Sequence, residues 1–351
     1  MADWLLGMGR GMSQTRAERL VAELQARGVD RVFCVPGESY LQVLDALRDS
    51  DIDTVVARQE GGAAMMAEAD GKMCMRRPGV CFVTRGPGAT NASAGVHIAQ
   101  QDSTPLVLCI GQVASTMLGR DAFQEVDYDA FFGGMAKAVF QLAEGDDPAT
   151  LVANAFEIAL TGRPGPVVIA LPEDLQGPFS SAPPSVGTDT AADPAGVETS
   201  DVDALVGMLH EAERPIALAG GSGWSKDGIA ALEAFAETWN VPVSVVFRRQ
   251  QLFNHDHGHY AGDCGIGVNP ALRRTIDSAD LVLVLGTRFS EIPSQSYDLL
   301  ENPVAGQRLV HVHVSETDRF AHADRVVTAH PQSLLAVLPK PVARSVAGRA
   351  G

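Results

Sequence analysis

Three short segments of the sequence combine residue types that can bind or act on a small molecule. Each directly follows an apolar stretch with the pattern of a buried strand, and the segments are Pro36–Ser39, Arg58–Ala63, which contains Glu60, and Thr84–Asn91. Open α/β sheets bind ligands at the carboxyl ends of their parallel strands, so this placement predicts a ligand site. Each segment alone also has an ordinary explanation. A glutamate at a helix start complements the helix dipole, and Gly-Pro-Gly is usually a turn.

The elements that must position these segments follow an alternating pattern. Continuous apolar stretches, typical of strands buried on both faces, are separated by stretches with apolar residues at helical spacing. In the first half of the chain the predicted strands are residues 32–37, 54–57, 80–84, 105–111 and 166–172, and the predicted helices are residues 13–28, 41–48, 61–75 and 91–100. This alternation is typical of an α/β fold with a parallel sheet covered on both faces.

The same pattern starts again in the second half of the chain, after a stretch rich in Pro, Ser, Thr and Gly that shows no apolar periodicity. The sequence therefore predicts two doubly wound parallel-sheet domains of the α/β class. The first covers residues 13–175 and the second covers residues 201–339, with a linker at 176–200 and a tail at 340–351. Residues 1–12 are expected to form a weakly specified extension.

Composition and charge exclude several classes of protein. The chain has 351 residues, of which 46% are hydrophobic and 20% are charged, as expected for a globular protein with two domains. Its formal net charge of −16 repels phosphate backbones and anionic lipids, so neither nucleic acid nor a membrane surface is an expected partner. The five cysteines are scattered and form no Cys-x-x-Cys pair, which is typical of free thiols in a reducing compartment. We expect a cytoplasmic protein.

Taken together, in this order and spacing, the three segments resemble the pyrimidine-binding domain of thiamine-diphosphate enzymes of the acetolactate synthase group. The second domain resembles the central domain of the same family. Further matching segments are Gly111–Val113, Ala122–Asp127, Gly162–Val167, Leu171–Asp174, Gly220–Gly223, Tyr260–Asp263 and Leu285–Phe289. The resemblance covers the chain from about Ser13 to Leu338, so a chance match is not a reasonable explanation.

The resemblance implies a catalytic role for Glu60. In this family a carboxylate hydrogen-bonds the N1′ nitrogen of the aminopyrimidine ring and drives it to the imino form, which removes a proton from the thiazolium carbon. Gly37, Gly86 and Asn91 are implied to bind the cofactor together with Glu60, although Asn91 could equally cap the helix that follows it. An apolar pocket would strengthen the bond between carboxylate and ring and would raise the carboxyl pKa.

The resemblance also assigns four residues to the substrate channel. Phe123 and Gln124 match a Phe-Gln pair that borders the channel of a neighbouring active site, and Gln59 and Gln101 are expected on the same channel. Two of the four depart from the family pattern. Gln59 stands where the family frequently has a histidine before the catalytic glutamate, and Gln101 stands where an aromatic or apolar residue is common. The chemistry is therefore expected to differ from that of a standard acetolactate synthase.

The family's third domain holds the cofactor's diphosphate through a Mg²⁺ ion bound by a Gly-Asp-Gly motif and a downstream Asn-Asn pair, oxygen ligands that suit this cation. Neither string occurs in these 351 residues, and the nearest one, Gly262–Gly265, is expected to be a loop. No residue is assigned as a metal ligand. The resemblance implies that the chain holds the pyrimidine end of thiamine diphosphate, and that a partner chain carrying both motifs holds the diphosphate and Mg²⁺. Two-fold symmetry predicts a homodimer core with two copies of each chain.

The expected function is that of one subunit of a split thiamine-diphosphate enzyme. It would decarboxylate a 2-oxo acid, with pyruvate as the expected substrate, and transfer the acyl unit to an acceptor that the sequence does not identify. The alternatives are a 2-oxo acid decarboxylase subunit, a non-catalytic nucleotide-binding or regulatory protein, and a piece of a full-length synthase. FAD at Gly220–Gly223 is a minority alternative, because Gly-x-x-Gly alone is weak evidence. His255, His257 and His259 could bind a metal, but a polar connector is the favoured interpretation.

Overall fold

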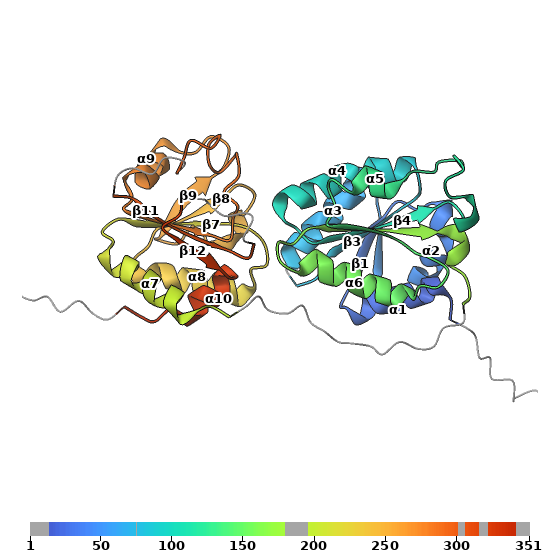
Figure 1. Cartoon of the computed structure of the whole chain (residues 1–351), viewed down its shortest axis with the longest axis horizontal. Coiled ribbons are helices and arrows are strands. Elements are labelled where there is room, and N and C mark those ends of the chain that lie inside the picture. Colours follow the sequence, from blue (N-terminus) through green and yellow to red (C-terminus); the bar gives the residue numbers. More distant parts are fainter. Residues whose placement is uncertain (1–13, 75, 180–195, 301–305, 316–321, 342–351) are drawn as a thin grey trace, which may run out of the picture. The chain divides into compact units, whose positions relative to one another are not determined.

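The chain folds into two compact α/β units, one formed by residues up to 191 and one formed by residues from 192 onward (Figure 1). The computed structural model describes residues 14–74, 76–179, 196–300, 306–315 and 322–341. The predicted extension at 1–12, residues 180–195 of the predicted linker and residues 342–351 of the predicted tail lie outside this description. The predicted fold class, with two parallel sheets, is confirmed.

The first unit is built on a six-stranded sheet in the order β2-β1-β3-β4-β6-β5, in which every pair of neighbours is parallel. All residues of β3, β4 and β6 are buried, which explains why these strands are continuous apolar stretches in the sequence. The strands are β1 (Arg31–Cys34), β2 (Asp53–Val56), β3 (Gly79–Val83), β4 (Leu106–Gln112), β5 (Ala138–Gln141) and β6 (Pro166–Pro172).

Helices cover both faces of this sheet, and a separate cluster of buried apolar residues lies on each face (Figure 1). One face carries α1 (Arg16–Ala26), α2 (Leu41–Arg48) and α6 (Pro148–Leu160). The other face carries α3 (Glu60–Cys74), α4 (Pro87–Asp102) and α5 (Tyr128–Phe132). Three short 3₁₀ turns follow strands: η1 (Glu38–Tyr40), η2 (Ser115–Met117) and η3 (Glu173–Leu175).

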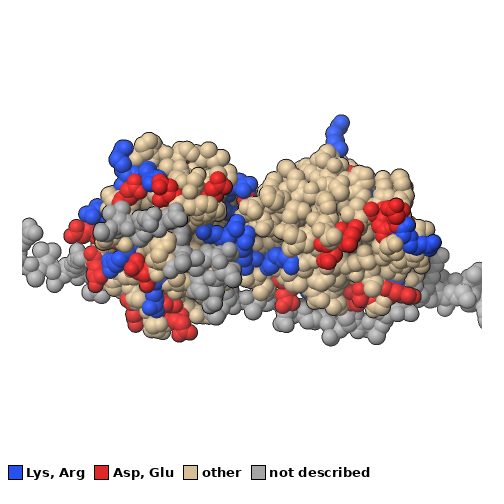
Figure 2. Space-filling view, turned by 45° about the horizontal axis from the view of Figure 1, so that its top comes forward, with Lys and Arg blue, Asp and Glu red and all other residues tan. Residues whose placement is uncertain are grey.

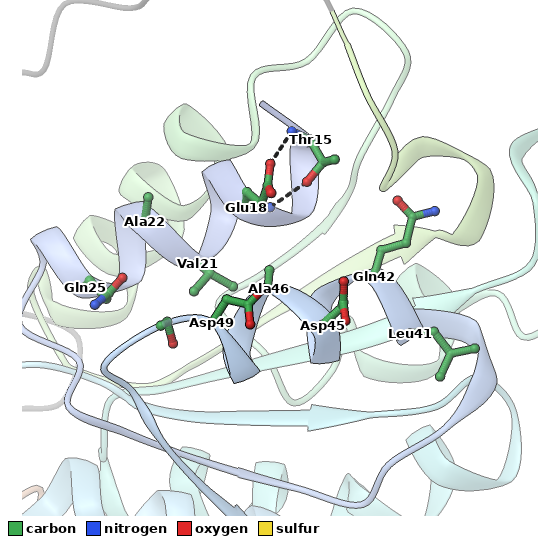
Figure 3. A pocket seen from close by; sticks show the side chains of 11 residues that line it. Thr15, Glu18, Val21, Ala22, Gln25, Leu41, Gln42, Asp45, Ala46 and Asp49 are labelled. Carbon is green, nitrogen blue, oxygen red and sulfur yellow. Dashed lines mark hydrogen bonds between the residues drawn. The ribbon is translucent and has the colours of Figure 1, made fainter. Parts of the chain in front are cut away.

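Local sequence signals explain where several helices begin. The Thr15 hydroxyl accepts a hydrogen bond from the Glu18 N–H at 3.0 Å, and the Thr15 N–H donates to Glu18 Oε2 at 2.7 Å, so the two residues form a capping box at the start of α1 (Figure 3). The bounds of α2 are those that the sequence predicts. Helix α4, in contrast, begins at Pro87 and not at Asn91, because Gly86 caps it and proline suits the first turn, where an N–H has no helical partner.

The second unit has a six-stranded parallel sheet in the order β12-β11-β10-β7-β8-β9. Its strands are β7 (Pro215–Ala219), β8 (Val243–Val246), β9 (Tyr260–Cys264), β10 (Leu281–Leu285), β11 (Arg308–His313) and β12 (Arg325–Thr328). Its helices are α7 (Thr199–Glu211), α8 (Lys226–Trp239), α9 (Pro270–Ser278) and α10 (Pro331–Val337), with the short turn η4 (Gln250–Leu252). None of the helices described in either unit is long and apolar enough to cross a bilayer.

Two predictions about the chain's organisation need correction. The string Gly262–Gly265 is not simply a loop, because its first three residues belong to β9, which pairs with β8. The linker does not begin at Gln176: this side chain is buried, and its amide donates to the carbonyl oxygens of Ser39 at 2.7 Å and Leu171 at 3.1 Å. Gln176 therefore belongs to the core of the first unit. At the other end of the predicted linker, Thr199 already begins α7.

Candidate active site

Glu60 is the first residue of α3, directly after the turn that follows β2. The residue before it, Gln59, caps the helix. Its side-chain oxygen accepts a hydrogen bond from the Gly62 N–H at 2.9 Å, and its backbone oxygen accepts one from the Ala63 N–H at 3.1 Å. The sequence predicts Gln59 as a substrate-channel residue, whereas in this structure its amide is turned back onto the helix and helps to fix the start of α3.

The structure brings Glu60 together with Asn91, which lies 31 positions further along the chain. The Asn91 amide donates a hydrogen bond to Glu60 Oε2 at 3.0 Å, and the contact is possible because α3 and α4 pack side by side. This hydrogen bond fixes the direction of the Glu60 carboxylate. Asn91, which the sequence predicts only as a cofactor residue or a helix cap, therefore orients the candidate catalytic group.

The second carboxylate oxygen of Glu60 is available to a ligand. Glu60 Oε1 accepts no hydrogen bond from the described part of the chain, and a Cβ atom added at Gly88 would lie 3.6 Å from it. A Cβ atom at Gly62 would meet nothing within 4 Å, so the neighbouring surface is open. A carboxylate with one anchored and one open oxygen, bordered by glycines, fits a flat ring that presents a nitrogen as hydrogen-bond partner.

Gly37 is required for packing within this unit. Its backbone is extended, and a Cβ atom would lie 2.4 Å from the Cβ of Thr84, at the end of β3. The same corner is tied by a hydrogen bond of 2.8 Å between the hydroxyls of Ser39 and Thr84. The resemblance implies that Gly37 lies at the cofactor site. The structure supplies a reason for glycine at this position, which is the close approach of two strand ends.

Gly86 has a backbone conformation and surroundings that both require glycine. Its φ of +58° lies in the left-handed region, and a Cβ atom would lie 2.7 Å from the Cβ of Gln124. Its N–H donates a hydrogen bond of 3.1 Å to the hydroxyl of Tyr128, whose pKa is raised to about 12 by burial. The start of α4 is thus packed against the loop that carries Phe123 and Gln124.

The four predicted channel residues occupy different places. Phe123 is 75% exposed, and Gln124 lies beside Gly86 at the start of α4. Gln101 lies in the last turn of α4, ten positions beyond Asn91, which corresponds to about 15 Å along a helix. The structure therefore does not bring Gln101 next to Glu60 within this unit.

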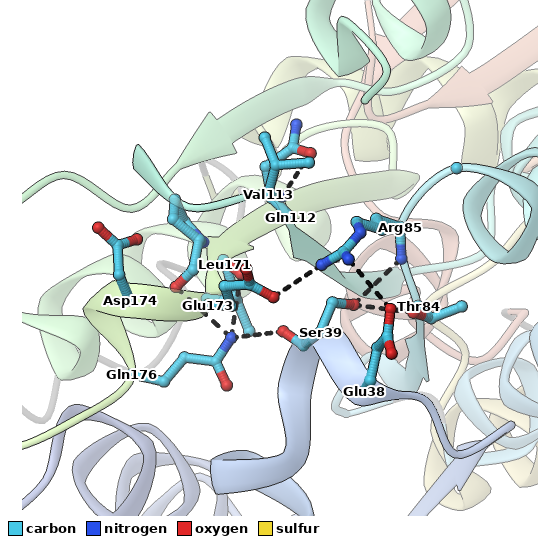
Figure 4. A network of polar contacts seen from close by, with 12 residues as sticks. Glu38, Ser39, Thr84, Arg85, Gln112, Val113, Leu171, Glu173, Asp174 and Gln176 are labelled. Carbon is cyan, nitrogen blue, oxygen red and sulfur yellow. Dashed lines mark hydrogen bonds and ion pairs between the residues drawn. The ribbon is translucent and has the colours of Figure 1, made fainter. Parts of the chain in front are cut away.

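A network of polar contacts at the carboxyl ends of β3 and β6 was not predicted as a unit (Figure 4). The guanidinium group of Arg85 donates to Glu173 Oε2 at 2.7 Å and to Glu38 Oε1 at 3.0 Å, and the Arg85 N–H donates to the Ser39 hydroxyl at 3.2 Å. The three charged residues lie in segments that the sequence had already marked, after β1, β3 and β6. Their mutual contact could not be read from the spacing, because it depends on the order of the strands in the sheet.

Several other polar side chains have structural partners. Lys137 donates hydrogen bonds to the carbonyl oxygens of Ile158 and Thr161, at the end of α6, where a cation complements the helix dipole. The three histidines that could bind a metal contact three different groups: His255 the Gln250 carbonyl, His257 the Glu237 carboxylate and His259 the Asn240 side chain. No group of three metal-binding side chains occurs among the residues that the structure describes.

A hollow of about 590 Å³ lies on the other face of the sheet, between α1 and α2 (Figure 3). Its walls combine apolar residues such as Val21 and Ala46 with the carboxylates of Glu18, Asp45 and Asp49. Because α3 and α4 lie on the opposite face, this hollow is separate from Glu60 (Figure 1).

The face of α3 that points away from the sheet is apolar and exposed. Met65 and Met66 are 43% and 37% exposed, Met73 is 65% exposed, and Gly62 and Ala69 complete the stripe. Much of the side of the first unit that is turned forward in Figure 2 carries no charged side chain. Exposed methionines at helical spacing next to a candidate catalytic group are typical of a protein–protein contact.

Two family models match the chain. The model described as "Thiamine pyrophosphate enzyme, N-terminal TPP binding domain" matches residues 14–131, and the model described as "Thiamine pyrophosphate enzyme, central domain" matches residues 202–338. The first match contains Glu60, Asn91, Phe123 and Gln124.

The chain is also similar to curated proteins of one kind. It is 30% identical over 330 residues to the acetolactate synthase isozyme 2 large subunit of Escherichia coli, a match that covers 93% of this chain and 59% of that protein. It is 32% identical over 280 residues to the acetolactate synthase large subunit of Corynebacterium glutamicum, covering 79% and 45%. It is 33% identical over 285 residues to the probable acetolactate synthase large subunit of Methanocaldococcus jannaschii, covering 78% and 47%.

The chain thus spans about half the length of the curated relatives that it matches. Both matched models belong to one family, their order along the chain is that of the two structural units, and the relatives carry a consistent name. The chain belongs to the thiamine pyrophosphate enzyme family, as a homologue of acetolactate synthase large subunits that comprises the N-terminal TPP-binding domain and the central domain.

Proposed function

We propose that this chain supplies the pyrimidine-binding half of a thiamine-diphosphate site. The assembled enzyme would decarboxylate a 2-oxo acid, with pyruvate as the expected substrate, and transfer the acyl unit to an acceptor. The observation that carries this proposal is the carboxylate of Glu60, held by Asn91 through one oxygen and open at the other. The names of the relatives support the acyl-transfer reaction over simple decarboxylation.

The residues of this chain would have different roles at the cofactor's ring. When bound, thiamine diphosphate supplies the carbon nucleophile and the electron sink that decarboxylation of a 2-oxo acid requires. Glu60 Oε1 would share a proton with a ring nitrogen, and Asn91 would keep the carboxylate aimed at that nitrogen. Gly88 and Gly62 would let the ring come close to the backbone, and Phe123 would exclude water from the substrate's path.

We also propose that a second polypeptide completes the site by holding the diphosphate and Mg²⁺. The Met-rich stripe of α3 supports this, because the stripe adjoins Glu60 and is uncovered in the isolated unit. Two-fold symmetry would give a homodimer core of this chain with two copies of the second polypeptide. The name "large subunit" carried by the relatives is consistent with assembly into a larger complex.

FAD is not part of the proposal. The Gly220–Gly223 turn is packed closely against β10, because a Cβ atom at Gly221 would lie 1.8 Å from the carbonyl oxygen of Gly286. The hydroxyl of Ser222 accepts a hydrogen bond from Arg249 at 2.8 Å.

We place the protein in the cytoplasm on the ground that its five cysteines are free, four of them buried in the two units.

Reconstitution tests the proposal. The purified chain should show no thiamine-diphosphate-dependent consumption of pyruvate. Addition of a polypeptide with the Gly-Asp-Gly and Asn-Asn motifs, together with Mg²⁺ and the cofactor, should produce carbon dioxide and a condensation product, measured by coupled assay and mass spectrometry. A stable complex with such a polypeptide that consumes no 2-oxo acid would contradict the proposed reaction. Release of the free aldehyde without condensation would favour the decarboxylase alternative.

A further inference from the structure

The segment that follows β4 is a closed loop, residues 113–126, which we call the Phe123 loop. Its two ends are tied by the buried side chain of Gln112, whose amide N–H donates to the Val126 carbonyl at 3.1 Å and whose oxygen accepts from the Val113 N–H at 2.9 Å. Near its beginning, Ser115 donates to the carboxylate of Asp174 from its N–H at 2.8 Å and from its hydroxyl at 2.6 Å. Such closed surface loops are frequently functional.

The tip of the Phe123 loop is organised around the carboxylate of Glu125. Glu125 Oε1 accepts a hydrogen bond from the Gly119 N–H at 2.5 Å, and Oε2 accepts one from the Ala122 N–H at 2.9 Å. Backbone N–H groups, with that of Ala122 contributing most and that of Gly119 next, lower the pKa of Glu125, so the carboxylate is charged at neutral pH. Hydrogen bonds to a charged acceptor are stronger than those between neutral groups.

The carboxylate also stabilises a backbone that would otherwise be unfavourable. Gly119, Asp121 and Gln124 have φ values of +73°, +55° and +63°, and the left-handed region is costly for the two residues that carry a Cβ atom. In this conformation the N–H groups of Gly119 and Ala122 both point at the charged carboxylate of Glu125. At this tip the side chain of Phe123 is 75% exposed.

The Phe123 loop is joined to the candidate active site. Gln124 fills the space that a side chain at Gly86 would need, since a Cβ atom there would lie 2.7 Å from Gln124 Cβ and 2.9 Å from its carbonyl oxygen. Gly86 caps α4, and Asn91 in the second turn of α4 holds Glu60. A conformational change at the tip of the loop would therefore act, through Gln124 and Gly86, on the helix α4 that carries Asn91.

We propose that Glu125 is a positioning residue, whose carboxylate fixes the tip of the Phe123 loop so that the ring of Phe123 forms an apolar wall for the 2-oxo acid. The contact between Phe123 and substrate rests on the proposed function. The effect of Glu125 on the conformation of the loop does not depend on it. The two parts make separate predictions, one for the isolated chain and one for the assembled enzyme.

The first test is amide hydrogen exchange on the isolated chain. Glu125→Ala should speed exchange at the N–H groups of Gly119 and Ala122 by about tenfold or more, because each loses a charged acceptor. Glu125→Gln, which keeps one acceptor oxygen, should have a smaller effect. Exchange within β4 should not change in either variant, which shows that the unit stays folded. Unchanged protection of both N–H groups in Glu125→Ala would overturn the inference.

A matched control is available in the same unit. Glu157 is an exposed glutamate of α6, and the described residues form no hydrogen bond with its side chain. Glu157→Ala should leave exchange in the Phe123 loop unchanged. Faster exchange there in the control would mean that the loop responds to general destabilisation, and the specific role of Glu125 would be contradicted.

The second test uses the reconstituted enzyme. Glu125→Ala and Phe123→Ala should each raise the KM for the 2-oxo acid by about tenfold, and the double variant should be no worse than either single one, because both act through the same ring. The affinity for thiamine diphosphate should be unchanged. Additive effects of the two substitutions would overturn the positioning role. Absence of cofactor-dependent turnover in the wild-type assembly would instead refute the proposed function, and the exchange measurements would still decide the role of Glu125 in the loop.

Discussion

Turnover of the assembled enzyme is expected to fall by about 100-fold or more when Glu60 is replaced by glutamine. The side chain keeps its size, and its amide oxygen can still accept the hydrogen bond from Asn91. An amide cannot share a proton with a ring nitrogen as a carboxylate does, so the acid–base step is lost while the fold is retained. The measurement is steady-state consumption of the 2-oxo acid by the wild-type and Glu60→Gln assemblies at saturating cofactor.

The control for this substitution is Glu157→Gln, which makes the same chemical change at an exposed position of α6 on the opposite face of the sheet. It should retain full activity. Both variants should elute with the second polypeptide in gel filtration as the wild type does. If Glu60→Gln forms the complex and turns over at a rate near that of the wild type, Glu60 is not the catalytic carboxylate.

A large effect on stability is expected from an equally small change, Gly71→Ala on α3. A Cβ atom at Gly71 would lie 2.3 Å from the carbonyl oxygen of Pro105 and 2.7 Å from the backbone nitrogen of Gly79. Both neighbours are backbone atoms at the starts of the central strands β3 and β4, so relief requires α3 to move away from β3. Overpacking of this kind costs about 3 kcal/mol of the free energy of unfolding.

The matched control lies on the same helix. A Cβ atom at Gly62 meets nothing within 4 Å, so Gly62→Ala should stabilise α3 by about 0.5–1 kcal/mol through the higher helix propensity of alanine. Urea unfolding can be followed through the exchange protection of β3 and β4, which reports the first unit separately from the second. Equal stabilities for the two variants would show that α3 does not pack against the sheet as described.

The close packing at Gly71 also bears on function. Helix α3 begins with Glu60, and its contact with α4 brings Asn91 to that carboxylate. A helix displaced at Gly71 would carry Glu60, the proposed catalytic group, with it. Gly71→Ala should therefore impair activity even in the fraction of molecules that stays folded.

Much of this arrangement could be predicted from the sequence. The continuous apolar stretches identified the central strands, because strands buried on both faces need no polar alternation. The short edge strand β5 was not predicted, since its residues are only partly buried and carry little pattern. Strand β9 was missed for the same reason, with four of its five residues half-buried.

In the candidate site, too, some features could be predicted from the sequence and others could not. Glu60 and Asn91 could each be selected from the resemblance, but their hydrogen bond depends on how α3 and α4 pack. The direction of the Gln59 side chain could not be predicted, because an amide before a helix can either cap it or face a ligand. The reason for glycine at position 37 lies in Thr84, which is distant in sequence and is brought close by the pairing of β1 with β3.

The most direct test of the central claim is calorimetric titration of thiamine diphosphate and Mg²⁺ into this chain alone, followed by the same titration into its complex with a polypeptide carrying the Gly-Asp-Gly and Asn-Asn motifs. The described residues include the Glu60 carboxylate, which we propose as the partner of the pyrimidine ring, but they include no cluster of metal-binding side chains. We predict no tight binding to the chain alone and tight, Mg²⁺-dependent binding to the complex. Tight, Mg²⁺-dependent binding to this chain without any partner would contradict the claim that it holds only one half of the site.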